Sequence, residues 1–133
     1  MGKRRWFAPA FLLWMAAVTY ACLTSFEDLG DPGFDLPYSD KIAHFVFYLG
    51  AGILGVFALR ERFGRRIGMN RALVLLVIGL SLYGGLIEGL QAILPTGRSA
   101  EWADFLANSC GLLLAVASVK GVFHEVKSLN WPD

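Results

Sequence analysis

Four long apolar stretches limit the folds that this chain can adopt. Residues 6–26 contain no charged side chain, and residues 42–59 contain none if His44 is neutral. Residues 72–97 are interrupted only by Glu88, and residues 102–119 only by Asp104. Because a helix of about 20 apolar residues crosses the hydrocarbon core of a membrane, each stretch is long enough for one crossing. We therefore predict a single-domain, all-α polytopic membrane protein with four transmembrane helices, at about residues 6–26, 41–59, 72–94 and 102–123.

The composition fits a chain whose outer surface is solvated by lipid. Hydrophobic residues make up 56% of the 133 residues, charged residues make up 17%, and the mean hydropathy is +0.52. Soluble domains carry charge on roughly a quarter of their residues. The chain is therefore too apolar for an ordinary soluble domain of this length.

The placement of the basic residues predicts the orientation. Most of them lie before the first apolar stretch, between the second and third, or after the fourth: Lys3, Arg4, Arg5, Arg60, Arg62, Arg65, Arg66, Arg71, Lys120 and Lys127. Since lysine and arginine accumulate in cytoplasmic loops, both termini are predicted to be cytoplasmic. The basic connector has a nucleic-acid-binding interpretation, but a topology signal in contact with anionic lipid explains it better. We expect membrane lipids as partners and no nucleic acid.

Two features near the first apolar stretch have more than one interpretation. A basic start followed by an apolar run resembles a cleaved signal peptide, but 21 uncharged residues exceed the usual length of such a run, and the segment around Cys22 is a poor cleavage site. We expect the stretch to remain as a helix. A disulfide between Cys22 and Cys110 is conceivable, but two buried, reduced cysteines are the expected state.

Polar side chains gather at one end of the predicted bundle. Asp40, His44 and Tyr48 recur every four residues and so share one helix face, with Lys41 beside them. The predicted topology brings that face to the same outer end as four polar residues of the third and fourth helices and one of the turn between them: Glu88, Gln91, Asp104, Asn108 and Arg98. We predict a shared site under the outer interface of the membrane.

Simpler interpretations exist for most of these residues. Asp40 and Asp104 could cap the starts of helices, and His44 and Asn108 could only hold helices together by hydrogen bonds. Arg98 could contact lipid phosphate. Glu88 is the hardest to explain structurally, because an unpaired charge within the hydrocarbon layer costs on the order of 2.5 kcal/mol or more. Small residues also predict close-packing ridges, at Ala51 and Gly55 in one helix and at Ser81, Gly85 and Gly89 in the next.

The chemistry that these residues could perform stays open. Glu88 and His44 could act as acid and base, with Asp104 as a further catalytic candidate. A metal site of His44, Asp40, Glu88 and Asp104 is possible, but one histidine with scattered carboxylates falls short of the usual ligand patterns, so we expect no metal. No signature for nucleotide binding, zinc proteolysis or serine hydrolysis is present, and we expect no cofactor.

Three segments resemble the signature blocks of VanZ-like membrane proteins. They are DKIAHFVFY, IEGLQ and GRSAEWADFLANSCG, which lie in order within residues 40–115. The resemblance implies a multi-pass protein of the bacterial cytoplasmic membrane, in a family named for an association with resistance to teicoplanin, a lipid-tailed glycopeptide. It brings no settled catalytic activity. By position it implies a ligand-binding set of Asp40, Lys41, His44, Tyr48, Glu88, Gln91, Arg98, Asp104 and Asn108.

The residues and the resemblance together lead to three functional hypotheses. The first is a protein that binds a lipid, a lipid-linked envelope precursor or a lipidated glycopeptide from the outer side. The second is a membrane-embedded acid–base enzyme acting on a lipid-linked envelope substrate, and the third is a purely structural membrane protein. The sequence leaves open the ligand, the oligomeric state and any role in antibiotic resistance.

Overall fold

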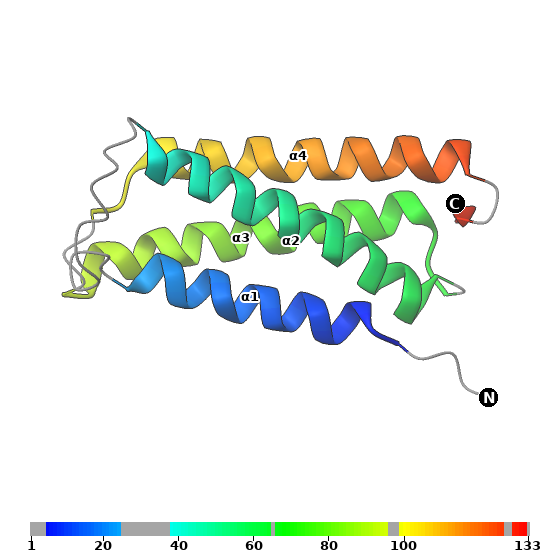
Figure 1. The fold of residues 1–133 in the computed structure, drawn as a ribbon, viewed down its shortest axis with the longest axis horizontal. Coiled ribbons are helices and arrows are strands. Elements are labelled where there is room, and N and C mark those ends of the chain that lie inside the picture. Colours follow the sequence, from blue (N-terminus) through cyan, green and yellow to red (C-terminus); the bar gives the residue numbers. More distant parts are fainter. Residues whose placement is uncertain (1–4, 25–37, 65, 96–98, 127–128, 133) are drawn as a thin grey trace.

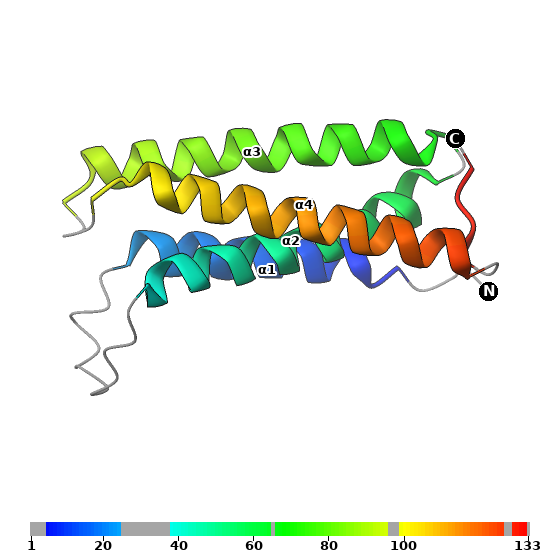
Figure 2. The same cartoon turned by 90° about the horizontal axis from the view of Figure 1, so that it is seen from above.

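The computed structural model describes residues 5–24, 38–64, 66–95, 99–126 and 129–132. Within these residues the chain forms four α-helices and no strand. They are α1 (Phe7–Leu23), α2 (Ser39–Phe63), α3 (Met69–Ile93) and α4 (Trp102–Glu125). Consecutive helices run in opposite directions, as Figures 1 and 2 show, so α2 and α4 begin at the end of the bundle where α1 and α3 finish. We call this the cluster end.

Three of the four helices are long and apolar enough to cross a membrane. These are α2, α3 and α4, with 25, 25 and 24 residues. The first helix is a shorter apolar helix of 17 residues, less than the predicted span of residues 6–26, of which residues 25 and 26 lie outside the described part. Its length, about 25 Å at 1.5 Å per residue, is near the lower limit for a crossing.

The second helix holds the bundle together, because its contacts with the other three helices are the most extensive. Its most extensive contact is with α4, where small residues let the two backbones approach. A Cβ atom added at Gly52 would lie 2.5 Å from the Cβ of Ala115. One added at Gly111 would collide with the carbonyl oxygen of Phe45. The register of α2 against α4 is therefore fixed by glycines on both helices.

Apolar side chains fill the interior and also cover much of the exterior. Val56, Leu80 and Leu112 are buried in the core between the helices. Leu13 and Leu82 point outward and are 74% and 71% exposed. A large apolar exterior is unfavourable in water and is expected where lipid is the solvent.

The small-residue ridge predicted on α3 is not used for packing within the described bundle. Gly85 and Gly89 are exposed, and a Cβ added at either would meet no atom within 4 Å. Instead α3 packs through the neighbouring face that carries Leu76 and Leu80. The ridge predicted on α2 does pack, since a Cβ added at Gly55 would lie 2.7 Å from Leu76.

Two further expectations need correction. Neither Asp40 nor Asp104 caps a helix: the cap positions of α2 and α4 are Tyr38 and Glu101, without side-chain cap hydrogen bonds, and both aspartates lie in the first turn. Neither cysteine forms a disulfide, as expected, but only Cys22 is buried. Cys110 lies on the outward face of α4 and is exposed, so the expectation that it is buried was wrong.

Side chains from neighbouring helices hold α1 in place at both ends. At its start, the carboxylate of Glu61 on α2 accepts hydrogen bonds from the backbone N–H groups of Trp6, Phe7 and Ala8, at 2.9, 3.0 and 3.3 Å. An acidic group satisfies the unpaired N–H groups of a helix start and complements its dipole. Near its other end, the backbone carbonyl of Cys22 accepts a hydrogen bond of 2.7 Å from Gln91 on α3.

The contact between α2 and α4 predicts that substitutions of two glycines of α4 differ in their effect on stability. Gly111→Leu should lower the free energy of unfolding by about 2 kcal/mol or more, because the new side chain must push α4 away from the backbone of α2. Gly121→Leu should be nearly neutral, since nothing lies within 4 Å of a Cβ at that position. Unfolding in SDS, followed by circular dichroism, measures both. Equal stability of the two variants would contradict the close contact.

Candidate functional site

The polar residues meet at the cluster end, where the starts of α2 and α4 lie beside the end of α3. In the described part of the chain, five polar or charged residues are buried: His44, Glu88, Gln91, Asp104 and Asn108. They come from three helices. Together with Asp40, Lys41, Tyr48 and Glu101 we call them the polar cluster. Burying such groups is costly unless they are paired, so their collection in one place demands an explanation.

One ring nitrogen of His44 forms a hydrogen bond, and the other has no hydrogen-bond partner among the described residues. Nδ1 lies 3.0 Å from the side-chain oxygen of Asn108. Because an amide oxygen only accepts, Nδ1 carries a proton in this pair, and in the neutral imidazole Nε2 then keeps its lone pair. Nε2 lies 3.9 Å from Oδ1 of Asp40 and 3.9 Å from Oδ2 of Asp104. The imidazole is thus fixed by α4 and turned toward two carboxylates.

Lys41 neutralises the carboxylates on the other side. Its Nζ lies 2.6 Å from Oε2 of Glu101, 3.0 Å from Oδ1 of Asp104 and 4.0 Å from Oδ2 of Asp40. Asp104 is buried, whereas the side chain of Lys41 is 27% exposed, so the lysine reaches from the rim into the cluster. Its charge is therefore already taken up by carboxylates of this chain.

Glu88 is placed between α2 and α4. Oε1 lies 4.0 Å from Nδ1 of His44, and Oε2 accepts a hydrogen bond of 3.3 Å from the backbone N–H of Glu101. The glutamate of α3 thus faces the histidine and is anchored at the residue that precedes α4. This placement could support proton exchange between Glu88 and His44.

Gly84 makes room for two polar groups in the interior. A Cβ added there would lie 3.0 Å from the hydroxyl oxygen of Tyr48 and 3.4 Å from the side-chain nitrogen of Asn108. The hydroxyl and the amide therefore both lie over the glycine of α3. A larger residue at position 84 would displace at least one of them.

Six buried side-chain atoms have no hydrogen-bond partner in the described part of the chain, and all belong to the polar cluster: His44 Nε2, Tyr48 Oη, Glu88 Oε1, Gln91 Oε1, Asp104 Oδ1 and Asn108 Nδ2. Asp104 Oδ1 at least lies close to the ammonium of Lys41. Each of the other five costs about 1–3 kcal/mol if it stays unpaired. Packing alone gives no reason to keep five such costs together.

Comparison with known proteins identifies the chain by family. A family model described as VanZ/LLP1 matches residues 3–124. The chain belongs to the VanZ/LLP1 family. Searches of curated proteins and of solved structures found no match. Family membership and three membrane-length helices together make this a VanZ-like membrane protein. The match reaches beyond residues 40–115 and includes α1.

The structure brings together eight of the nine residues that the sequence nominated for this VanZ/LLP1 protein. Arg98, the ninth, lies outside the described residues. Gln91 lies at the edge, where it binds the backbone of α1. The sequence did not nominate Glu101 or Gly84 for the site. The place of Glu101 three residues before Asp104, which puts it beside the same helix start, is the signal that could have identified it.

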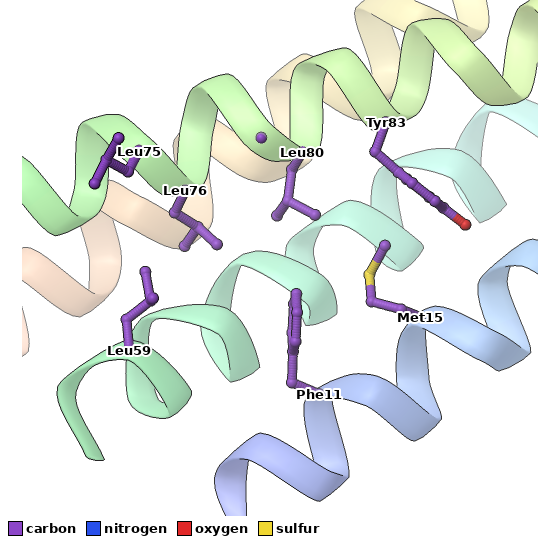
Figure 3. Close-up of a pocket in the computed structure, with 8 residues that line it drawn as sticks. Phe11, Met15, Leu59, Leu75, Leu76, Leu80 and Tyr83 are labelled. Carbon is purple, nitrogen blue, oxygen red and sulfur yellow. The ribbon is translucent and has the colours of Figure 1, made fainter. Parts of the chain in front are cut away.

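An apolar cleft of about 400 Å³ lies elsewhere in the VanZ/LLP1 bundle, between α1, α2 and α3. Figure 3 shows Phe11 and Met15 of α1 facing Leu76 and Leu80 of α3 across it. Tyr83 is its only polar lining residue, and its hydroxyl pairs with that of Thr19. The cleft suits hydrocarbon and offers no reactive group, so the polar cluster remains the candidate site.

Lys41→Met should destabilise the VanZ/LLP1 protein by about 1–3 kcal/mol. It leaves the carboxylate of Asp104 buried without its cation, and the partial exposure of Lys41 keeps the loss below that of a fully buried pair. Lys120→Met is the matched control, because Lys120 is exposed and donates a hydrogen bond to the neutral side chain of Asn70. It should change stability by less than about 0.5 kcal/mol. Thermal unfolding in detergent compares them, and equal losses would argue against a role of Lys41 in pairing Asp104.

Proposed function

We propose that this VanZ/LLP1 protein crosses the bacterial cytoplasmic membrane four times, with both termini in the cytoplasm, and binds an envelope molecule at the outer face. The placement of the basic residues supports the orientation. In the alternating bundle that orientation puts the cluster end outside, because α2 and α4 begin there and α1 and α3 finish there. The ligand is a lipid, a lipid-linked envelope precursor or a lipidated glycopeptide.

The observation that carries this proposal is the set of unpaired atoms in the polar cluster. Within the described part of the chain, a hydroxyl, an amide oxygen, an amide nitrogen, a carboxylate oxygen and an imidazole nitrogen of the cluster lack hydrogen-bond partners. A ligand rich in hydroxyl and amide groups would satisfy the first four, and a site built for such groups rejects molecules that lack them. The sugar and peptide parts of envelope precursors and glycopeptides have this chemistry, while their lipid tails would stay in the bilayer.

The charges of the cluster refine the expected contacts. The sequence suggests that Lys41 and Arg98 meet an anionic headgroup. Lys41, however, is engaged by Glu101 and Asp104 within the chain, and Arg98 lies outside the described residues. We therefore assign recognition to the neutral hydrogen-bonding groups of Tyr48, Gln91 and Asn108 and to the unpaired oxygen of Glu88, with Lys41 keeping the other carboxylates in place.

A second candidate function is acid–base catalysis on a lipid-linked envelope substrate. It is favoured by one observation: Glu88 Oε1 and His44 Nε2 both lack hydrogen-bond partners and both belong to groups that can exchange protons. Asp104 would orient the imidazole and balance its charge. The binding proposal needs no such step. The Glu88→Gln variant distinguishes the two proposals.

The antibiotic susceptibility of a host that produces the protein tests whether the polar cluster is needed for protection against a lipidated glycopeptide. Wild type should protect against teicoplanin and not against vancomycin, while Glu88→Gln and His44→Ala at equal membrane levels should lose at least half of that protection. His124→Ala, an exposed histidine at the other end of α4, should protect like wild type. If no variant differs from empty vector, a lipidated glycopeptide is excluded as the ligand of this chain.

Purified protein separates binding from catalysis. In nanodiscs, binding of a lipid-linked peptidoglycan precursor should fall at least tenfold for Glu88→Gln, with no turnover by wild type. Turnover by wild type that Glu88→Gln abolishes, with binding unchanged, would establish the enzyme instead. If Glu88→Gln changes only the unfolding temperature and neither binding nor turnover, the protein is purely structural, as the third hypothesis holds.

A further inference from the structure

Two carboxylates and one imidazole nitrogen converge at the rim of the polar cluster. Single ligand atoms of Asp40, His44 and Asp104 all lie within 4.8 Å of one another. We propose that these three side chains bind a divalent transition-metal ion, through His44 Nε2 and one oxygen of each aspartate. The metal would use other atoms of the polar cluster than the proposed envelope ligand, so this proposal does not rest on that ligand.

The histidine supplies the observation that points to a ligand. Its side chain is 2% exposed, and within the described part of the chain Nε2 has no hydrogen-bond partner, although it faces Asp40 Oδ1 and Asp104 Oδ2 at 3.9 Å each. In the neutral imidazole, a lone pair aimed between two carboxylate oxygens is an unfavourable arrangement unless a cation lies between them. At 3.9 Å neither oxygen is close enough to form a hydrogen bond with Nε2.

Lys41 lies on the side of both aspartates that faces away from His44. The space between His44 Nε2 and the two remaining carboxylate oxygens is therefore left for a metal ion. Its ammonium lies nearest Oδ1 of Asp104 and Oδ2 of Asp40. The opposite oxygen of each carboxylate faces His44. The lysine therefore orients both carboxylates from behind and does not occupy the space in front of the imidazole.

Asn108 completes the arrangement that metal-binding histidines require. Such histidines donate their second ring N–H to a carbonyl or carboxylate, which fixes the tautomer and the plane of the ring. His44 Nδ1 has this contact, at 3.0 Å from the Asn108 side-chain oxygen. The tautomer that results leaves Nε2 free to coordinate.

The donor set indicates the class of metal. A nitrogen and two carboxylate oxygens suit Zn²⁺ or Mn²⁺, whereas Mg²⁺ and Ca²⁺ prefer oxygen alone. Bonds of roughly 2.1 Å would draw the three atoms to about 3.4 Å from one another, a small movement of side chains. Because Asp40 keeps 41% of its side chain exposed, the ion could enter from the rim and retain open positions for water or a ligand.

The sequence favoured no metal, since one histidine and dispersed acids lack the spacing of known motifs. Asp40 and His44 are four residues apart on α2, but Asp104 belongs to another helix. Only the packing of α4 against α2 brings the third ligand into reach. The fold therefore supplies a grouping of ligands that spacing alone does not predict.

Isothermal titration of Zn²⁺ and Mn²⁺ into metal-free protein in nanodiscs, purified without a histidine tag, tests the site. Wild type should bind one ion per chain and gain thermal stability from it. Asp40→Asn at the rim and His44→Ala should each weaken binding at least tenfold, and Asn108→Leu by roughly 10–100-fold. Mg²⁺ should bind more weakly than either transition metal.

The matched control is the exposed pair of His124 and Glu125, whose atoms also lie 3.9 Å apart. His124→Ala should bind the metal like wild type. Should His44→Ala fail to fold, Asp40→Asn still decides, because Asp40 lies at the rim and can be replaced by a residue of the same shape. No saturable binding by wild type, unchanged binding by Asp40→Asn, or loss with His124→Ala would each overturn the proposal.

Discussion

The close approach of α2 and α4 is the contact on which the rest of the structure depends. Gly52 and Gly111 remove the side chains that would separate the two backbones, and Ala115 continues the contact. Lipid offers no hydrophobic force to press helices together, so such close packing supplies much of the association energy. Because α2 and α4 begin side by side, His44 meets Asp104 and Asn108 near the helix starts. The site is a consequence of the packing.

The polar cluster lowers the stability of the helix bundle locally. Five buried polar atoms without hydrogen bonds would reduce stability by several kcal/mol in total at about 1–3 kcal/mol each. The apolar core below them and the small-residue contact offset that loss. Sites that bind ligands or metals often retain such costs, because the groups are held ready for a partner that arrives later. The proposed envelope ligand and the proposed metal would satisfy different atoms of the cluster. The ligand would pair with Tyr48, Glu88, Gln91 and Asn108, and the metal with Nε2 of His44.

The two ends of the bundle differ in how their polar groups are satisfied. At the end away from the cluster, both oxygens of Glu61 accept hydrogen bonds, three in all, from backbone N–H groups at the start of α1. At the cluster end the carboxylates of Asp40 and Asp104 each turn one oxygen to Lys41 and the other to His44. A carboxylate therefore serves as a structural cap in one place and as part of a candidate site in the other.

The sequence by itself determined the helices and the level of the polar residues. Apolar runs of membrane length must be helical, because lipid cannot satisfy backbone polar groups, and a rise of 1.5 Å per residue then sets the depth of Glu88, His44 and Asp104. Only the tertiary structure decided which faces meet. Helical periodicity shows that Ser81, Gly85 and Gly89 share a face, but it does not fix the rotation of α3, and that face points outward. The same rotation brings Gly84 next to the hydroxyl of Tyr48. The packing of α4 against α2 then places Asp104 opposite His44 and Glu101 beside Lys41.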